Sequence, residues 1–284
     1  MKKNQWIVAG AGILLTISLF VYFIYGDHTA RIKEQDANTN AEIITIDSIL
    51  VHAKERLTPD QLTRINLLEN SISRGNVTDQ QLTVYHRLEH FWKDTARVPA
   101  LYAWYNAEAA RLENSEKKLN FAAHLFLNIL RSESNAQLRK WEALQAKELF
   151  ERSLKINPVN DSARVGIGAC YLFGEISPTP MEGILMIRTV AEKDSTNVFA
   201  QMMLGHGSVL SGQYEKAIDR FQNALLTDPD NTEALLMIVK IAEEYEKSSQ
   251  TDKAVAAYSI ALRSVKKEEW RSELQKRIDD LKKK

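Results

Sequence analysis

The sequence has little cysteine and no excess of either charge, and both features exclude classes of function. Cys170 is the single cysteine among 284 residues, so the chain forms no intramolecular disulfide and contains no CxxC metal or redox motif. Its neighbours are small and apolar, which is typical of a packing cysteine and not of a nucleophile. Lys plus Arg and Asp plus Glu each number 37. A chain without net positive charge has no general attraction for nucleic acid, and we expect no nucleic-acid partner.

The chain also lacks the common motifs of nucleotide-binding proteins and hydrolases. None of the strings GxxxxGK[ST], GxGxxG and GxSxG occurs. One string does resemble a catalytic motif, because His86, Glu89 and His90 match the zinc-binding pattern HxxEH. A hydrolase of this kind also needs a third metal ligand, a base and a substrate cleft, and no other part of the sequence supplies them.

A simpler interpretation of this segment is an amphipathic helix. Val84, Leu88 and Trp92 recur every four residues, which is the apolar stripe of a helix packed on its neighbours. We therefore expect surface or packing roles for the two histidines, no enzymatic activity and no cofactor. A metal-dependent hydrolase that uses His86, Glu89 and His90 stays as an alternative.

One long uncharged run lies near the N-terminus. Residues 6–26 carry no charge, and about 20 helical residues rise about 30 Å, the thickness of a bilayer core. We predict a transmembrane anchor there, with residues 1–5 in the cytoplasm because Lys2 and Lys3 precede the run. The alternative, a cleaved signal peptide, has a shorter apolar region. Residues 27–41 are polar and predict a tether.

Internal periodicity is the most informative feature of the C-terminal half. The pattern is a set of three residues. The first has a small or short side chain, the second, four positions later, has a large one, and the third, three positions after that, again has a small or short one. The pattern occurs four times: at Ala146, Phe150 and Ser153; at Gly183, Ile187 and Val190; at Ala217, Phe221 and Ala224; and at Ala254, Tyr258 and Ala261. The sets are 37, 34 and 37 residues apart, a period typical of helical repeats. We expect the extra residues in the loops at 174–180 and 247–252.

The third set resembles a tetratricopeptide repeat (TPR). Leu204 and Gly205, then Tyr214, Ala217, Phe221, Ala224 and Pro229 fit the TPR pattern of Leu-Gly in the first helix, A-x3-F in the second and a closing proline. The resemblance covers residues 137–266 and implies an all-α, right-handed solenoid of helix-turn-helix units. The predicted domain spans 98–266, with clear repeats from 137 and individual repeats near 161–197, 198–231 and 232–266.

The segments on either side of the repeats are also predicted to be helical. Residues 42–97 contain helix starts without a repeat register and are interpreted as a neck or N-terminal cap. At the C-terminal end, Trp270, Leu274, Ile278 and Leu281 recur at helical spacing with charges between them. This pattern predicts a capping helix over 267–284, with its apolar face on the last repeat.

In TPR proteins the first helix of each repeat lines a groove that receives a peptide or a helix of a partner. Carried over by position, the resemblance implies a groove lined by Ser162, Val165, Ala169, Leu172 and Phe173; by Phe199, Met202, His206, Val209 and Leu210; and by Glu233, Leu236, Lys240, Glu243 and Glu244. The first two sets are mostly apolar, which favours an amphipathic helix or an apolar peptide as partner. Closure of the groove by the chain's own helices stays open as an alternative.

In its predicted layout the chain resembles TPR proteins of the bacterial cell envelope that carry an N-terminal anchor. The resemblance implies a single-pass inner-membrane protein, attached through residues 6–26, whose C-terminal domain lies in the periplasm and acts as a non-enzymatic scaffold or adaptor. The layout is less similar to that of organelle import receptors, which display TPRs to the cytosol. A self-assembling structural spacer is the third interpretation.

Overall fold

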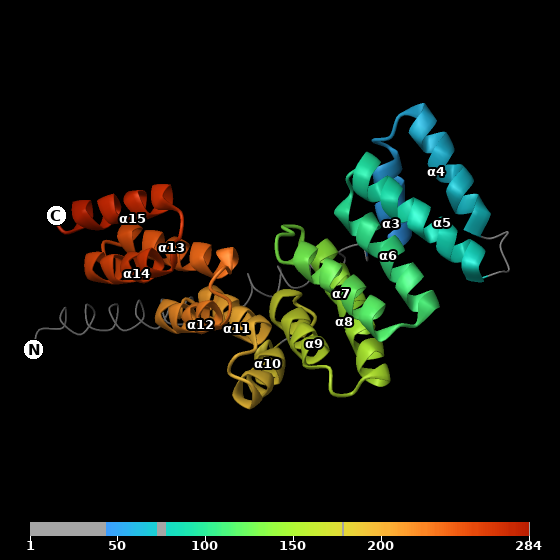
Figure 1. Ribbon diagram of the computed structural model, residues 1–284. Helices are drawn as coiled ribbons and strands as arrows, with labels where there is room; N and C mark the ends of the chain where they lie inside the picture. The colour runs from blue at the N-terminus through green and yellow to red at the C-terminus, as the bar shows by residue number, and fades with distance from the viewer. Residues whose placement is uncertain (1–43, 73–77, 178, 284) are drawn as a thin grey trace, which may run out of the picture. The chain divides into compact units, whose positions relative to one another are not determined.

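The computed structural model of the protein describes residues 44–72, 78–177 and 179–283. All the helices described below belong to one compact unit, Thr45–Lys284. Every regular element among these residues is a helix, which confirms the all-α prediction (Figure 1).

The helices follow one another through short connections. In chain order they are α3 (Ile46–Lys54), α4 (Pro59–Ile72), α5 (Thr78–His90) with the π-helical turn η2 (Phe91–Thr95), α6 (Pro99–Glu113), α7 (Glu116–Leu130), α8 (Ala136–Ile156), α9 (Asp161–Phe173), α10 (Met181–Lys193), α11 (Val198–Leu210), α12 (Tyr214–Thr227), α13 (Thr232–Lys247), α14 (Thr251–Ser264) and α15 (Glu268–Leu281).

Consecutive helices pack in pairs from α7 onward. Helix α7 packs on α8, α9 on α10, α11 on α12 and α13 on α14, and the first helices of neighbouring pairs also touch, α7 on α9 and α9 on α11. All twelve residues of the four periodic sets lie in the second helices and are buried. The periodicity therefore marks the core between the helices, as the sequence predicted.

The loops that lead into the first helices repeat in detail. An asparagine precedes α9, α11 and α13, and its side-chain oxygen accepts a hydrogen bond from a backbone N–H three residues later, which satisfies one of the free donors at a helix start. The pairs are Asn160 with Ala163 at 3.0 Å, Asn197 with Ala200 at 2.9 Å and Asn231 with Ala234 at 2.9 Å.

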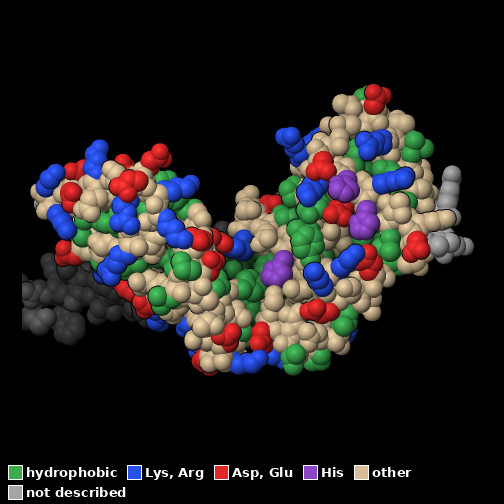
Figure 2. Space-filling model, viewed as in Figure 1, with side chains coloured by type: hydrophobic (Ala, Val, Ile, Leu, Met, Phe, Trp, Pro, Cys, Tyr) green, Lys and Arg blue, Asp and Glu red, His purple; other side chains and the backbone are tan. Residues whose placement is uncertain are grey.

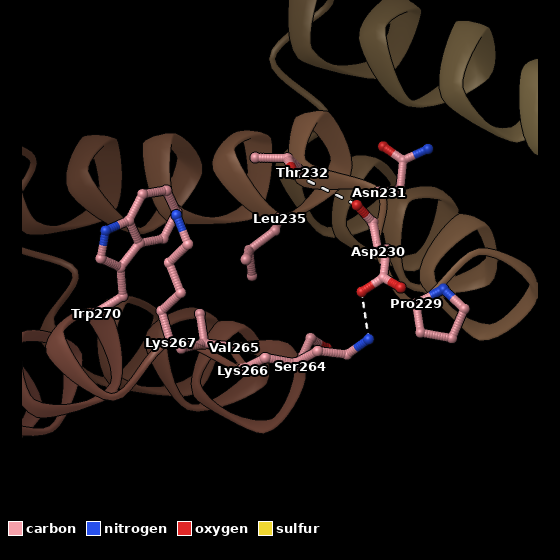
Figure 3. Close-up of a pocket in the computed structure, with 10 residues that line it drawn as sticks. All are labelled: Pro229, Asp230, Asn231, Thr232, Leu235, Ser264, Val265, Lys266, Lys267 and Trp270. Atoms are coloured by element: carbon pink, nitrogen blue, oxygen red, sulfur yellow. Dashed lines mark hydrogen bonds and ion pairs between the residues drawn. The ribbon is translucent and has the colours of Figure 1, made fainter.

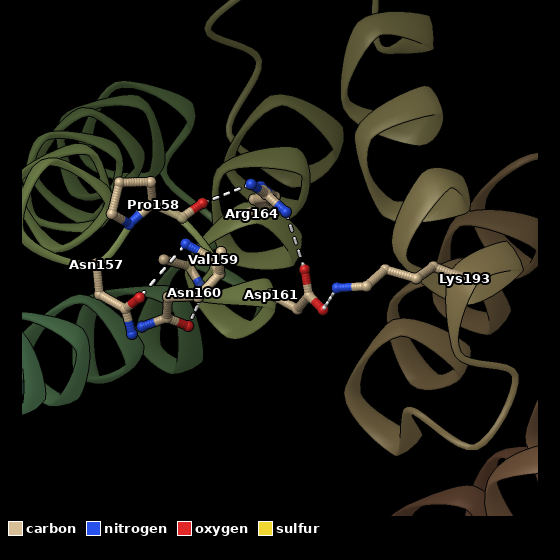
Figure 4. A network of polar contacts seen from close by, with 8 residues as sticks. Asn157, Pro158, Val159, Asn160, Asp161, Arg164 and Lys193 are labelled. Atoms are coloured by element: carbon tan, nitrogen blue, oxygen red, sulfur yellow. Dashed lines mark hydrogen bonds and ion pairs between the residues drawn. The ribbon is translucent and has the colours of Figure 1, made fainter.

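The first of these loops carries additional polar contacts (Figure 4). Asp161 accepts a hydrogen bond from Lys193 Nζ at 2.7 Å and another from Arg164 at 3.1 Å, and the lysine in particular lowers the pKa of the Asp161 carboxyl. The start of α9 is thereby tied to the end of α10.

The length differences between repeats are absorbed in two ways. The loop from α9 to α10 covers 174–180, as predicted, whereas the turns before α12 and α14 cover only 211–213 and 248–250. The predicted insertion at 247–252 is therefore wrong. The three additional residues lengthen α13, which has 16 residues where α11 has 13. Three residues are close to one helical turn, so the buried face keeps its direction.

The helices on either side of the pairs are held by apolar contacts at both ends of the array. Residues from α3 to α6 share one apolar cluster that contains Ala53, Ile65, Leu88, Phe91, Trp92, Leu101 and Tyr105. At the other end, α15 packs on α14 and buries Leu274, Ile278 and Leu281.

The predicted localisation, a single-pass inner-membrane protein with a periplasmic C-terminal domain, is contradicted by the helices that the structure describes. Within 44–72, 78–177 and 179–283, no helix is both long enough and apolar enough to cross a membrane. The longest, α8, has 21 residues but carries charged side chains along its length, which a bilayer core excludes. The predicted anchor at 6–26, with residues 1–5 and the tether at 27–41, lies outside the described residues.

Two glycines hold α9 and α10 in close contact. A Cβ atom added to Gly168 would lie 2.6 Å from the carbonyl oxygen of Gly183, so the two backbones touch. Although alanine favours a helix by about 1 kcal/mol over glycine, Gly168→Ala should lower the free energy of unfolding by about 1–3 kcal/mol, because overpacking against a backbone cannot be relieved by a side chain. Urea denaturation measures this.

Gly207→Ala in α11 is the matched control for that substitution. Its new Cβ would meet only the end of the Leu172 side chain, at 2.9 Å from Cδ2, and that flexible side chain can turn away. The free energy of unfolding should be unchanged or slightly higher. Equal losses in the two variants would contradict a backbone contact at Gly168.

Glu142 in α8 is a buried carboxyl group without a hydrogen-bond partner. Its side chain is 0% exposed, and neither carboxylate oxygen has a hydrogen-bond partner among the described residues. Burial, with a smaller contribution from Glu133, raises the pKa of Glu142 from 4.5 to about 8. The folded protein therefore holds a proton that the unfolded chain releases, and this carboxyl destabilises the fold increasingly as the pH rises from 4.5 to 8.

Glu142→Gln should remove this pH dependence. Between pH 5 and pH 8 the wild type should lose on the order of 2–4 kcal/mol of unfolding free energy relative to the variant, measured by denaturant titration at both pH values. Glu151→Gln, at a partly exposed position of the same helix that pairs with Lys147 at 2.6 Å, should leave the wild-type dependence intact. A wild-type slope in the Glu142→Gln variant would be the contrary result.

Candidate functional site

The residues of the predicted groove lie on α9, α11 and α13, at different depths. The deepest are Val165, Ala169, Met202 and His206, which are buried. An intermediate group consists of Ser162, Leu172, Phe173, Phe199, Val209 and Glu243, and the exposed group consists of Leu210, Glu233, Leu236, Lys240 and Glu244. The surface available to a partner is therefore supplied mainly by the end of α11 and by the outer face of α13.

A polar cluster joins three separate helices at this surface. Nη2 of Arg131, at the end of α7, lies 2.6 Å from Nε2 of His206 on α11. The same histidine nitrogen lies 2.9 Å from Oε1 of Glu233, in the first turn of α13, and Arg131 also forms an ion pair with Glu233. The side chains are 20%, 11% and 50% exposed, in the order Arg131, His206, Glu233. The cluster is thus open to solvent on the Glu233 side.

Hydrogen bonds within this cluster stabilise the ionised form of Glu233. The bond from His206, followed by the bond and the charge of Arg131, lowers the pKa of Glu233 from 4.5 to about 2, against the opposing effect of partial burial. Nε2 of a histidine carries one proton or none, so it donates to Glu233 or accepts from Arg131, but not both. The low pKa keeps Glu233 ionised. Only one of the two contacts to Nε2 of His206, from Arg131 or to Glu233, can be a hydrogen bond at any one time.

Aromatic rings surround the buried side of His206. Its ring centroid lies 6.4 Å from that of Phe173 and 5.3 Å from that of Phe221, both edge to face. These ring contacts hold the imidazole in one orientation. The contact with Phe173 joins two residues of the predicted groove, one on α9 and one on α11.

A second histidine fills the groove beside the start of α9. Nε2 of His124, on α7, lies 2.9 Å from the hydroxyl of Ser162, and its ring lies 5.0 Å from that of Phe199. Burial lowers the pKa of His124. This part of the groove is closed by the chain's own side chains, and sequence reasoning assigned no role to His124 or Arg131.

Two exposed leucines flank the polar cluster. Leu210 is 67% exposed and lies four residues after His206, and Leu236 is 41% exposed and lies three residues after Glu233. Residues three or four apart share a helix face. The cluster therefore borders two apolar side chains that contribute little to the core.

The HxxEH string does not assemble a metal site. Nδ1 of His86 lies 3.2 Å from Glu89, whereas Nδ1 of His90 lies 3.2 Å from Asp94, a residue outside the motif. Both rings are exposed on α5, and histidines are visible at the surface in Figure 2. In the part of the chain that the structure describes, no three His, Cys, Asp or Glu side chains come together in a way that could hold a metal ion.

A small cavity lies away from the groove, where the loop before α13 meets the loop before α15 (Figure 3). Lys266 forms an ion pair with Asp230 on one side of it, and Lys267 Nζ lies 5.6 Å from the ring centroid of Trp270 on the other. The cavity of about 230 Å³ is smaller than typical small-molecule sites of about 300–1,000 Å³. This cavity is therefore not a better candidate for the functional site than the residues of the predicted groove.

Comparison with known proteins does not identify a family for this chain. No protein-family model matches it, and no curated protein matches it. A functional assignment therefore depends on the geometry of the groove and on the repeat pattern.

Replacement of Glu233 by glutamine should lower stability modestly at neutral pH. Because half of the side chain is exposed, we expect a loss of only about 0.5–1 kcal/mol in the free energy of unfolding. A lowered pKa stabilises the fold above the unfolded value and stops doing so as the pH falls. The difference between wild type and variant should thus disappear between pH 4.5 and about 2.

Denaturation at pH 7 and at pH 2 measures this difference, and the double variant Arg131→Gln/Glu233→Gln supplies the control. If the ion pair is responsible, the two single losses should not add in the double variant. A difference that persists at pH 2 would assign the effect to packing instead.

Proposed function

We propose that the chain is a non-enzymatic scaffold of TPR-type helical repeats that binds a protein partner along α9, α11 and α13. The observation that carries this proposal is the exposure of Leu210 and Leu236 at groove positions, beside a polar cluster that three helices build together. Exposed apolar side chains with a polar rim are typical of protein-binding surfaces.

The repeat pattern supports the TPR-type architecture. The small and large residues of the four sets are buried, which is consistent with the TPR resemblance, and the asparagine caps recur before α9, α11 and α13. In repeat proteins of this kind, each helix pair contacts its neighbours in the chain, and the first helices form a continuous surface. That surface is the natural place for a partner.

The residues at the surface favour an amphipathic helix as the partner. The leucines offer apolar contact, while Lys240 and Glu244 on α13 are exposed and provide a charged rim. A helix with one apolar face matches such a surface through residues at the spacing i, i+3, i+4 and i+7.

The test is a pair of charge substitutions with a matched control. Leu210→Glu combined with Leu236→Glu should abolish the capture of specific partners by the full-length protein, because two charges would enter the apolar part of the interface. The partners are identified by affinity capture and mass spectrometry and then measured with purified proteins. Leu226→Glu is the control, since Leu226 is 81% exposed on α12, a second helix.

Two outcomes would count against the proposal. Partners that bind all three proteins equally well would not use the groove. A mass that rises with protein concentration, with no foreign partner captured, would instead favour a self-assembling spacer.

A further inference from the structure

The cluster of Arg131, His206 and Glu233 has the composition of an anion site that the chain itself has filled. Arg131 and His206 present nitrogen atoms from α7 and α11, and the carboxylate comes from a third helix. Arg131 is 102 residues from Glu233 in the sequence. The contact is therefore a product of the tertiary fold and not of local helix geometry.

Arg131 uses only part of its binding capacity in this arrangement. A guanidinium group carries five N–H donors in a fork that matches both oxygens of a carboxylate. Among the described residues, its polar contacts all run through Nη2, to Nε2 of His206 and to Oε1 of Glu233. Nε and Nη1 have no hydrogen-bond partner among the described residues and are not fully buried.

Glu233 is also the member of the cluster that can leave most easily. Its side chain is 50% exposed, whereas those of Arg131 and His206 are 20% and 11% exposed. If Glu233 turned into solvent, it would be hydrated, but Arg131 and His206 would be left partly buried without a carboxylate partner. Such a site favours replacement of one carboxylate by another.

We propose that Arg131 and His206 bind an acidic side chain of the partner, and that Glu233 occupies this position in the unbound protein as an internal competitor. The inference rests on the proposed function, and it specifies the chemistry of the partner. The ligand is an amphipathic helix whose Asp or Glu side chain replaces Glu233 while its apolar residues contact Leu210 and Leu236. Those leucines lie one turn from His206 and from Glu233, within the reach of one helical peptide.

The test uses short peptides selected from a random displayed library against the full-length protein. Each selected peptide is synthesised with an amidated C-terminus, so that only side chains supply carboxylates, and in a second form with Asp and Glu replaced by Asn and Gln. Affinities are measured by fluorescence polarisation for the wild type, Arg131→Gln, Glu233→Gln, the double variant Leu210→Glu/Leu236→Glu and the control Glu151→Gln. The control removes the same charge from α8, a second helix outside the predicted groove, at a residue that pairs with Lys147.

We expect groove-binding peptides to be acidic. Arg131→Gln should weaken them about tenfold, the effect of one charge-assisted hydrogen bond, and should abolish the difference between the acidic and neutral forms. Glu233→Gln should strengthen the acidic forms severalfold and leave the neutral forms unchanged. Glu151→Gln should change neither form by a comparable factor.

Other results would distinguish a failure of the anion site from a failure of the proposed function. Peptides that are sensitive to Leu210→Glu with Leu236→Glu but bind equally well in acidic and neutral form would overturn the anion site and leave the proposed function standing. Equal strengthening by Glu233→Gln and Glu151→Gln would assign the effect to net charge and also overturn it. If no peptide is sensitive to the leucine changes, both proposals fail.

Discussion

The structure depends on how closely the two helices of a pair approach each other. At Gly168 and Gly183 the backbones of α9 and α10 are in contact, and at Gly205 the helix backbone faces the ring of Phe221. Small residues at these positions allow the second helix to lie near the first, and large ones fill the space beside them. The spacing between pairs follows from this contact, because each second helix also packs on the first helix of the next pair.

The polar cluster is a consequence of that spacing. Helix α7 touches α9, and α9 touches α11, and this packing places Arg131 beside residues that are 75 and 102 positions away in the sequence. A wider helix pair would move α13 away from α7 and separate Glu233 from Arg131. Packing in the core, far from the surface, thus determines whether the groove holds an anion site.

The sequence predicted the helices and their buried faces better than it predicted the site. The four periodic sets are regular because each is constrained by the same local contact, and all of their members are buried. Arg131 and His124 show no periodicity, since each meets its partners once, across several helices. The position of a groove residue was also an incomplete guide to exposure: Val165 and Leu210 were assigned together, but only the leucine lies at the surface. The HxxEH string shows the converse problem, because spacing alone could not reveal that His90 turns to Asp94.

The asparagine-capped loops have a further consequence for the architecture. Each of the three joints between helix pairs has the same length, with loops at 157–160, 194–197 and 228–231, whereas the turns within pairs and the helices themselves vary. A joint of constant length and constant capping starts each next helix from the same local geometry. Differences in size between units are therefore confined to the turns within pairs and to the helices themselves. The array is modular at its joints, and its diversity lies within its modules.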